Sequence, residues 1–194
     1  MEVFELQGEY MRKMSNEEFF RFCRENPELK IERKANGDIE VMSPTGFQTG
    51  KINLVINGYL FEWYQKKAIG EVVGTDTGFT LPNGAMRSPD AAWVSEERVS
   101  KIPEEDKKTF PHVCPDFVVE LKSPSDRLKV LQDKMHEWIA NGCRLGWLIV
   151  PEEEQVYIYQ KDGAVDEVQG FDQKLSGEDV LPGFELDLRG LRIA

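Results

Sequence analysis

Two acidic residues and a lysine in the middle of the chain have the types and spacing that metal-dependent phosphodiester chemistry requires. Glu120 and Lys122 continue the apolar run 117–119, and Asp90 opens another apolar, strand-like run 30 residues earlier. Side chains alternate along a strand, so Glu120 and Lys122 are expected on one face. Two carboxylates hold a hard cation such as Mg²⁺ through oxygen, and a lysine beside them can act on a water at the metal.

The same Glu-x-Lys pattern has a purely structural interpretation. A carboxylate and an ammonium on a buried strand are costly unless they are paired or bound to a metal. Glu120 and Lys122 could therefore form a buried salt bridge without any catalytic role. The spacing alone leaves both interpretations open.

Segments around these residues resemble the bacterial Uma-two (Uma2) family of restriction endonucleases, within the PD-(D/E)XK nuclease superfamily. The resemblance runs from about Met14 to Leu188. It rests on residues 88–94 (SPDAAWV), 114–120 (CPDFVVE), 123–126 (SPSD), 141–142 (NG) and 145–149 (LGWLI). It implies an α/β, restriction-endonuclease-like fold, in which a central mixed β-sheet is flanked by helices and extended by β-hairpins. The strands carrying Asp90 and Glu120 are then expected side by side at the sheet centre.

The resemblance also implies an activity and a set of site residues. The expected activity is Mg²⁺- or Mn²⁺-dependent endonucleolytic hydrolysis of DNA. Asp90, Glu120 and the backbone carbonyl of Leu121 would hold the metal, and Lys122 would assist the attacking water. Because cleavage of both DNA strands needs two sites, a homodimer is expected, although no stripe in the sequence specifies its interface.

Glu32 and Lys134 are two further candidates, each with an alternative. In the family, a glutamate in the short strand before the hairpin glycine often completes the acidic cluster, and Glu32 has this place. A lysine on the helix after the Glu120 strand is also frequent, and Lys134 matches it. The alternatives are a solvent-facing edge residue for Glu32 and a solvated helix face for Lys134. The histidine that many members carry near the start of the long helix is absent, and Gln48 stands there.

Hydrophobic spacing predicts the elements that position these residues. Two main helices are expected, over residues 48–66 and from Ser125 or Asp126, as the N-cap, to about Ala140, with Gly142 just beyond the end. Ser15 and Glu18 form a capping-box pattern ahead of a shorter helix. Strands are expected over 29–32 and 39–42, around an Asn-Gly turn, and over 71–74, 78–81, 87–94, 144–150, 155–159 and 164–168.

Length and composition indicate one domain over residues 1–194, with 40% hydrophobic residues. The chain has no apolar stretch near the length of a membrane span and no signal-peptide pattern, so a cytoplasmic protein is expected. Cys23, Cys114 and Cys143 are odd in number and widely spaced, which favours neither a disulfide framework nor a zinc site.

The net charge of −11 is the main observation against DNA binding, because phosphates are bound chiefly by Lys and Arg. Residues 121–147 are locally different, with five cationic and three acidic side chains, a balance of +2. Two alternatives to a self-sufficient nuclease therefore stay open. One is a binding or scaffold protein that kept the fold without turnover, and the other is a nuclease subunit that needs a basic partner.

Overall fold

A six-stranded mixed sheet forms the centre of the protein. The computed structural model describes residues 3–193. The sheet has the order β11-β10-β9-β8-β7-β4, with β8 and β9 parallel and the other neighbours antiparallel. Its strands are β4 (Glu71–Val73), β7 (Ala91–Val94), β8 (Phe117–Leu121), β9 (Leu145–Val150), β10 (Gln155–Gln160) and β11 (Val165–Gln169). The expected adjacency of the Asp90 and Glu120 strands is confirmed, since β7 pairs with β8.

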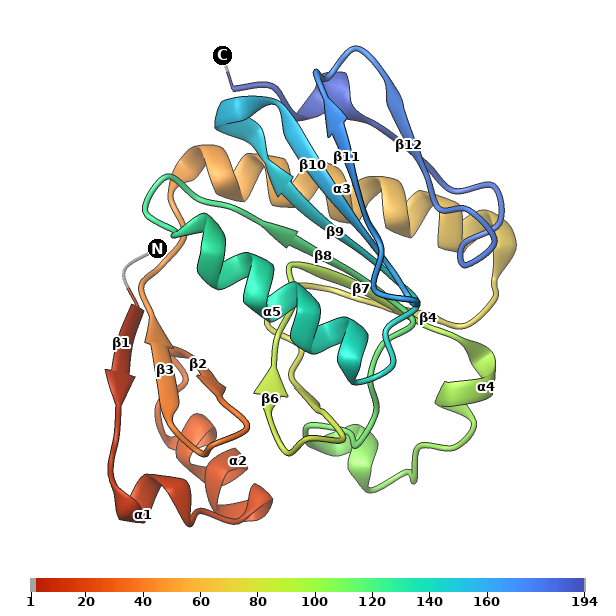
Figure 1. The fold of residues 1–194 in the computed structure, drawn as a ribbon. Coiled ribbons are helices and arrows are strands. Elements are labelled where there is room, and N and C mark those ends of the chain that lie inside the picture. Colours follow the sequence, from red (N-terminus) through yellow and green to blue (C-terminus); the bar gives the residue numbers. More distant parts are fainter. Residues whose placement is uncertain (1–2, 194) are drawn as a thin grey trace.

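The two long helices cover opposite faces of this sheet (Figure 1). They are α3 (Phe47–Lys67) and α5 (Leu128–Ala140), both close to their predicted bounds. Alternation along β8 sends Phe117, Val119 and Leu121 into the cluster packed under α3 and Val118 into the cluster under α5. Glu120 therefore faces α5.

A second sheet, of five strands, is built mainly from the N-terminal part of the chain and has the order β1-β3-β2-β6-β5. Its strands are β1 (Val3–Leu6), β2 (Lys30–Arg33), β3 (Ile39–Met42), β5 (Phe79–Thr80) and β6 (Met86–Arg87). The predicted hairpin is confirmed as β2–β3, with Gly37 at φ 87° in its turn. β2 lies between β3 and β6, so the interpretation of Glu32 as a solvent-facing edge residue is wrong.

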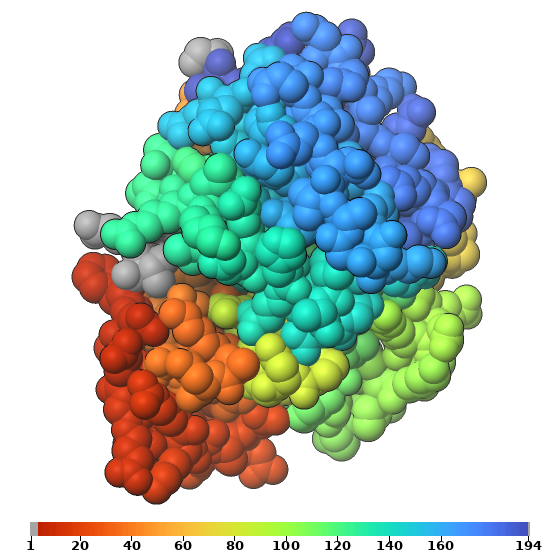
Figure 2. All heavy atoms as spheres, viewed as in Figure 1, coloured from red at the N-terminus to blue at the C-terminus, as the bar shows by residue number. Residues whose placement is uncertain are grey.

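The N-terminal segments occupy one end of the molecule, shown in red and orange in Figure 2. Here α1 (Glu9–Arg12) and α2 (Asn16–Glu25) lie beside the second sheet, and Phe19 of α2 packs with Ile31, Ile39 and Met86. The capping box of Ser15 and Glu18 is present as predicted. The single strand predicted over 87–94 is instead divided between β6 and β7, and the intervening Ser88-Pro89-Asp90 carries the chain from one sheet to the other.

The remaining elements are short. α4 (Glu96–Val99) and the 3₁₀ turn Asp106–Lys108 lie between β7 and β8 in the chain. The 3₁₀ turn Pro151–Glu153 joins β9 to β10. β12 (Lys174–Ser176) pairs with β13 (Glu185–Asp187), and the 3₁₀ turn Leu188–Leu191 follows. No helix within residues 3–193 is long and apolar enough to cross a membrane.

The start of α5 differs from the prediction. Its N-cap is Arg127, without a side-chain cap, and neither Ser125 nor Asp126 takes that role. Asp126 Oδ2 instead accepts hydrogen bonds from Ser123 N–H (2.8 Å) and Ser123 Oγ (2.7 Å), which closes the turn that follows β8. The C-terminal prediction is confirmed, with Gly142 at φ 104° directly after the helix.

Candidate active site

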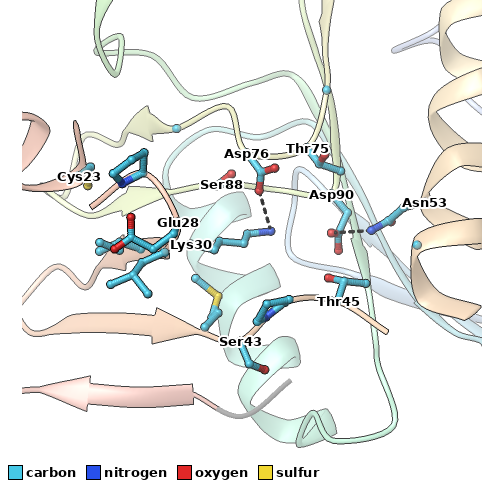
Figure 3. A pocket seen from close by; sticks show the side chains of 18 of the residues that line it. Cys23, Glu28, Lys30, Ser43, Thr45, Asn53, Thr75, Asp76, Ser88 and Asp90 are labelled. Atoms are coloured by element: carbon cyan, nitrogen blue, oxygen red, sulfur yellow. Dashed lines mark hydrogen bonds and ion pairs between the residues drawn. The ribbon is translucent and has the colours of Figure 1, made fainter. Parts of the chain in front are cut away.

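Asp90 is held in place by contacts with both β8 and α3. Its backbone N–H donates to the Val119 carbonyl (3.0 Å), and its Oδ2 accepts a hydrogen bond from Leu121 N–H of β8 (2.8 Å). Its Oδ1 accepts a hydrogen bond from Asn53 Nδ2 of α3 (3.1 Å), which Figure 3 shows. The carboxylate therefore sits where the entry to β7 meets the end of β8.

Glu120 is buried, with 3% of its surface exposed, and both of its carboxylate oxygens are engaged by α5. Oε1 accepts a hydrogen bond from Trp138 Nε1 (2.9 Å). Lys134 Nζ lies 2.9 Å from Oε1 and 3.0 Å from Oε2. Because residues four apart on a helix share a face, Lys134 and Trp138 reach the same carboxylate.

Lys134 also joins Glu120 to the second sheet. Its Nζ lies 2.9 Å from Glu32 Oε1, and the lysine side chain is only 12% exposed, so its assignment to a solvated helix face is wrong. Glu32 is held in addition by Arg87 Nη1, 3.0 Å from Oε2, and by Ser88 N–H, which donates to Oε1 (3.0 Å). One ammonium thus bridges two buried carboxylates from different sheets.

The ionisation of these groups is set by burial and by their neighbours. Burial raises the pKa of Glu120 to about 7, and Asp90 and Glu32 add to this effect against the opposing charge of Lys134. Burial would also raise the pKa of Glu32, but Lys134 and Arg87 outweigh it and lower that pKa to about 2. The pKa of Lys134 lies above the ordinary lysine value, because attraction to Glu120 and Glu32 exceeds the effect of burial.

Lys122 has a partner other than Glu120. Its Nζ lies 3.4 Å from Glu152 Oε2 and donates to the Ser123 carbonyl (3.2 Å). Its backbone N–H still donates to the Ile149 carbonyl of β9 (2.9 Å), one residue beyond the end of β8. The structural alternative, a salt bridge between Glu120 and Lys122, is not what forms, because Glu120 pairs with Lys134 and Lys122 with Glu152.

Two cavities meet at Asp90. One, of about 630 Å³, is lined by Glu32, Glu120 and Lys134 together with Asp90. The other, of about 810 Å³, lies between the second sheet and α3, and Figure 3 shows Asp90 at its wall, opposite the ion pair of Lys30 and Asp76. Only the smaller cavity contains both predicted metal-binding carboxylates, and we take it as the candidate active site.

Arg87 also contacts charged residues of the candidate active site, and no pattern in the sequence predicted this role. Its guanidinium contacts Glu32, Glu40 Oε2 (2.6 Å) and Glu137 Oε2 (2.6 Å), and its side chain is 9% exposed. Glu40 lies directly opposite Glu32 in the β2–β3 register. The Asn-Gly turn predicts the hairpin that pairs Glu32 with Glu40, whereas no residue spacing predicts the contacts of Arg87 or Glu137.

The donor set fits a weakly held, hard divalent cation. Within residues 3–193, no three His, Cys, Asp or Glu side chains are grouped to hold a metal ion by themselves. Mg²⁺ commonly binds through one or two carboxylates and completes its octahedron with waters and substrate phosphate oxygens. Asp90 and Glu120 can supply such a pair, provided that Glu120 gives up one of its contacts to α5.

Comparisons with a protein family and with a solved structure support the fold described above. Residues 16–189 match the family described as "Putative restriction endonuclease" (Uma2). A crystal structure described as a putative nuclease belonging to DUF820, from Anabaena variabilis ATCC 29413, has a TM-score of 0.73 and 17% sequence identity. The match covers 92% of this chain and 97% of that one. No curated protein matches the sequence. The fold is therefore restriction-endonuclease-like.

Proposed function

The chain belongs to the Uma2 family, and from that premise we propose that it is a divalent-metal-dependent endonuclease that hydrolyses DNA phosphodiester bonds. The reaction would take place in the cavity lined by Glu32, Asp90, Glu120 and Lys134. One observation carries the proposal. Two carboxylates, one directly before β7 and one on the neighbouring β8, line one cavity with a lysine whose ammonium is held against Glu120.

Asp90, Glu120 and the backbone carbonyl of Leu121 would hold the cation. Mg²⁺ or Mn²⁺, when bound, supplies Lewis-acid stabilisation of the phosphate charge and a more acidic water. Asp90 is suited to this role because β8 and α3 hold its carboxylate in place before any ligand arrives. Such preorganisation lowers the cost of assembling the site at the moment of reaction.

Lys134 is the lysine that the contacts favour for the chemical step. Its ammonium would stabilise the negative charge that develops on the phosphate, and Glu32 would act as a positioning residue that aims it. Lys122, the lysine of the Glu-x-Lys pattern, is the alternative. It would first have to leave Glu152, with which it is paired at the end of β8.

The charge of the cavity is consistent with a requirement for a cation. Its lining contains five cationic and seven acidic side chains, a formal balance of −2 that one divalent cation would cancel. The net charge of −11 favours a second candidate, in which the chain is a nuclease subunit that acquires DNA affinity from a basic partner. If the protein hydrolyses no DNA, it is a binding or scaffold protein that has the same fold without catalysis.

Calorimetric titration with Mn²⁺ and single-turnover cleavage of DNA in Mn²⁺ test the proposal together. Wild type is expected to bind the ion and to cut, and Asp90→Asn and Glu120→Gln are expected to lose both properties. Asp76→Asn is the matched control, because Asp76 lines the other cavity and pairs with Lys30. Binding that survives in Asp90→Asn would refute its assignment. Metal binding without cleavage of any DNA would favour the partner-dependent or silent alternatives.

The same cleavage assay separates the two lysines. Losing one charge-stabilising contact in the transition state typically lowers turnover about 10²-fold or more. Lys134→Met is expected to show this loss and Lys122→Met to retain most of the rate. The reverse order would restore Lys122 as the catalytic lysine.

A further inference from the structure

The outward face of α3 carries three large apolar side chains. Phe47, Leu54 and Phe61 are 86%, 74% and 53% exposed. They are spaced seven residues apart, close to two helical turns, so they form one stripe along the helix. The opposite face packs on the central sheet through Ile52, Ile56, Leu60 and Trp63. The described chain covers the sheet-facing side of this helix and leaves the stripe open to solvent, beside the exposed polar residues Lys51 and Gln65.

Two glycines lie in the same stripe. A Cβ added at Gly50 or Gly58 would meet nothing within 4 Å in the protomer. Glycine in an exposed helix interior weakens the helix relative to alanine, so both positions cost stability without relieving any contact. What they provide is two places on the outer surface where the backbone is open to close approach by another helix.

The stripe is symmetric about Leu54. Phe47 and Phe61 stand seven residues on either side of it, and Gly50 and Gly58 stand four residues on either side. In a two-fold contact between antiparallel helices, a residue before the axis faces the residue at the same distance after it in the other copy. A contact centred on Leu54 would therefore match each phenylalanine with a phenylalanine and each glycine with a glycine.

We propose that this face is the interface of a homodimer in which two α3 helices pack antiparallel across a two-fold axis at Leu54. The occupant is a second copy of this chain, because the order Phe-Gly-Leu-Gly-Phe is complementary to itself when reversed. A stripe on one helix is smaller than a standard stable interface, so the dimer is expected to be reversible and dependent on concentration. Gly50 and Leu54 also line the larger cavity, which places the second copy at its rim.

Sedimentation equilibrium from low to high micromolar concentration tests the dimer. Wild type is expected to shift from monomer to dimer, and Leu54→Asp is expected to raise the dissociation constant by about 100-fold or more, because two like charges would meet on the axis. Circular dichroism would verify that this exposed substitution leaves the fold intact. Val130→Asp, at a 51% exposed apolar position on α5, is the matched control and should leave association unchanged. A wild type that stays monomeric, or a dimer indifferent to Leu54→Asp, would overturn the proposal.

The glycines give a second test in which two effects have opposite signs. Gly58→Ala should raise the melting temperature of the dilute monomer, since alanine favours the helix and its Cβ meets nothing. The same methyl group should weaken the dimer, because it stands between the two backbones. An alanine variant that strengthens the dimer would contradict close helix approach.

A short bifunctional thiol crosslinker tests the register. Leu54→Cys should crosslink with itself, whereas Phe47→Cys should crosslink efficiently only when mixed with Phe61→Cys. The wild-type chain sets the background, since it has three free cysteines, of which Cys114 and Cys143 are buried and Cys23 is half-buried. Efficient self-crosslinking of Phe47→Cys would exclude an axis at Leu54.

Discussion

Replacing Lys134 by methionine should destabilise the metal-free protein far more than the same change at Lys122. Lys134 Nζ lies 2.9 Å from both Glu32 and Glu120, whose side chains are 2% and 4% exposed. Removing one partner of a buried ion pair typically costs about 3–5 kcal/mol, because the charge left behind is uncompensated. Glu32 keeps Arg87, and Glu120 can take up a proton, so we expect the lower end, about 3 kcal/mol.

Lys122 provides the matched comparison. Its partner Glu152 is 45% exposed and 3.4 Å away. Solvent-exposed pairs contribute about 0–1 kcal/mol, so Lys122→Met should cost less than about 1 kcal/mol. Both substitutions remove one positive charge and leave side chains of similar length, which makes the local environment the main difference between them.

Urea unfolding in EDTA at neutral pH measures the difference. With a slope of about 2 kcal/mol per molar, a loss of about 3 kcal/mol lowers the midpoint by about 1.5 M, whereas Lys122→Met should move it by less than about 0.5 M. The deficit of Lys134→Met should also shrink toward pH 5, where Glu120 is protonated in the folded state. If the urea midpoint shifts equally in the two variants, or more in Lys122→Met, Lys134 is not the cation that stabilises Glu32 and Glu120.

Two other perturbations probe the same cluster. In EDTA, wild-type stability should fall as pH rises from about 4.5 to 7, because the folded-state pKa of Glu120, about 7, exceeds the unfolded value of 4.5. This decrease in the free energy of unfolding should be on the order of 3 kcal/mol in the wild type and absent in Glu120→Gln. A wild-type pH profile as flat as that of the variant would contradict the raised pKa of Glu120. Arg87→Met strips a cation from three carboxylates and should lower the thermal midpoint far more than Arg192→Met, whose side chain is 38% exposed.

Local features of the fold were predictable because short-range chemistry determines them. The β2–β3 hairpin follows from Asn36-Gly37, since glycine readily takes the positive φ that the turn uses. The start of α2 follows from Ser15 and Glu18, whose reciprocal hydrogen bonds need only each other. The adjacency of the strands beside Asp90 was expected from family resemblance rather than from periodicity.

The contacts of the candidate site were not predictable in the same way. Alternation placed Lys122 on the same face as Glu120, but it does not determine which partner a side chain takes, and Lys122 pairs with Glu152. Lys134 reaches Glu120 because of the rotation of α5 on the sheet, and it reaches Glu32 because the second sheet docks there. The contact of Arg87 with Glu137 of α5 depends on the same docking. These contacts join residues up to 102 apart in sequence, and spacing carries no information about them.

The electrostatics of the cavity lead to a last prediction, which concerns DNA affinity rather than cleavage. The cavity lining has a formal balance of −2 and the chain a net charge of −11, so DNA phosphate is repelled until a cation is present. Fluorescence anisotropy with a labelled duplex should therefore show binding at least about 10-fold tighter in Ca²⁺ than in EDTA. The gain should disappear in Asp90→Asn, which removes a proposed ligand, and persist in Asp76→Asn. Equal affinity in Ca²⁺ and EDTA, or a gain that survives in Asp90→Asn, would mean that DNA is held elsewhere on the chain or not at all. A chain with no affinity under any condition would instead need the basic partner that its charge suggests.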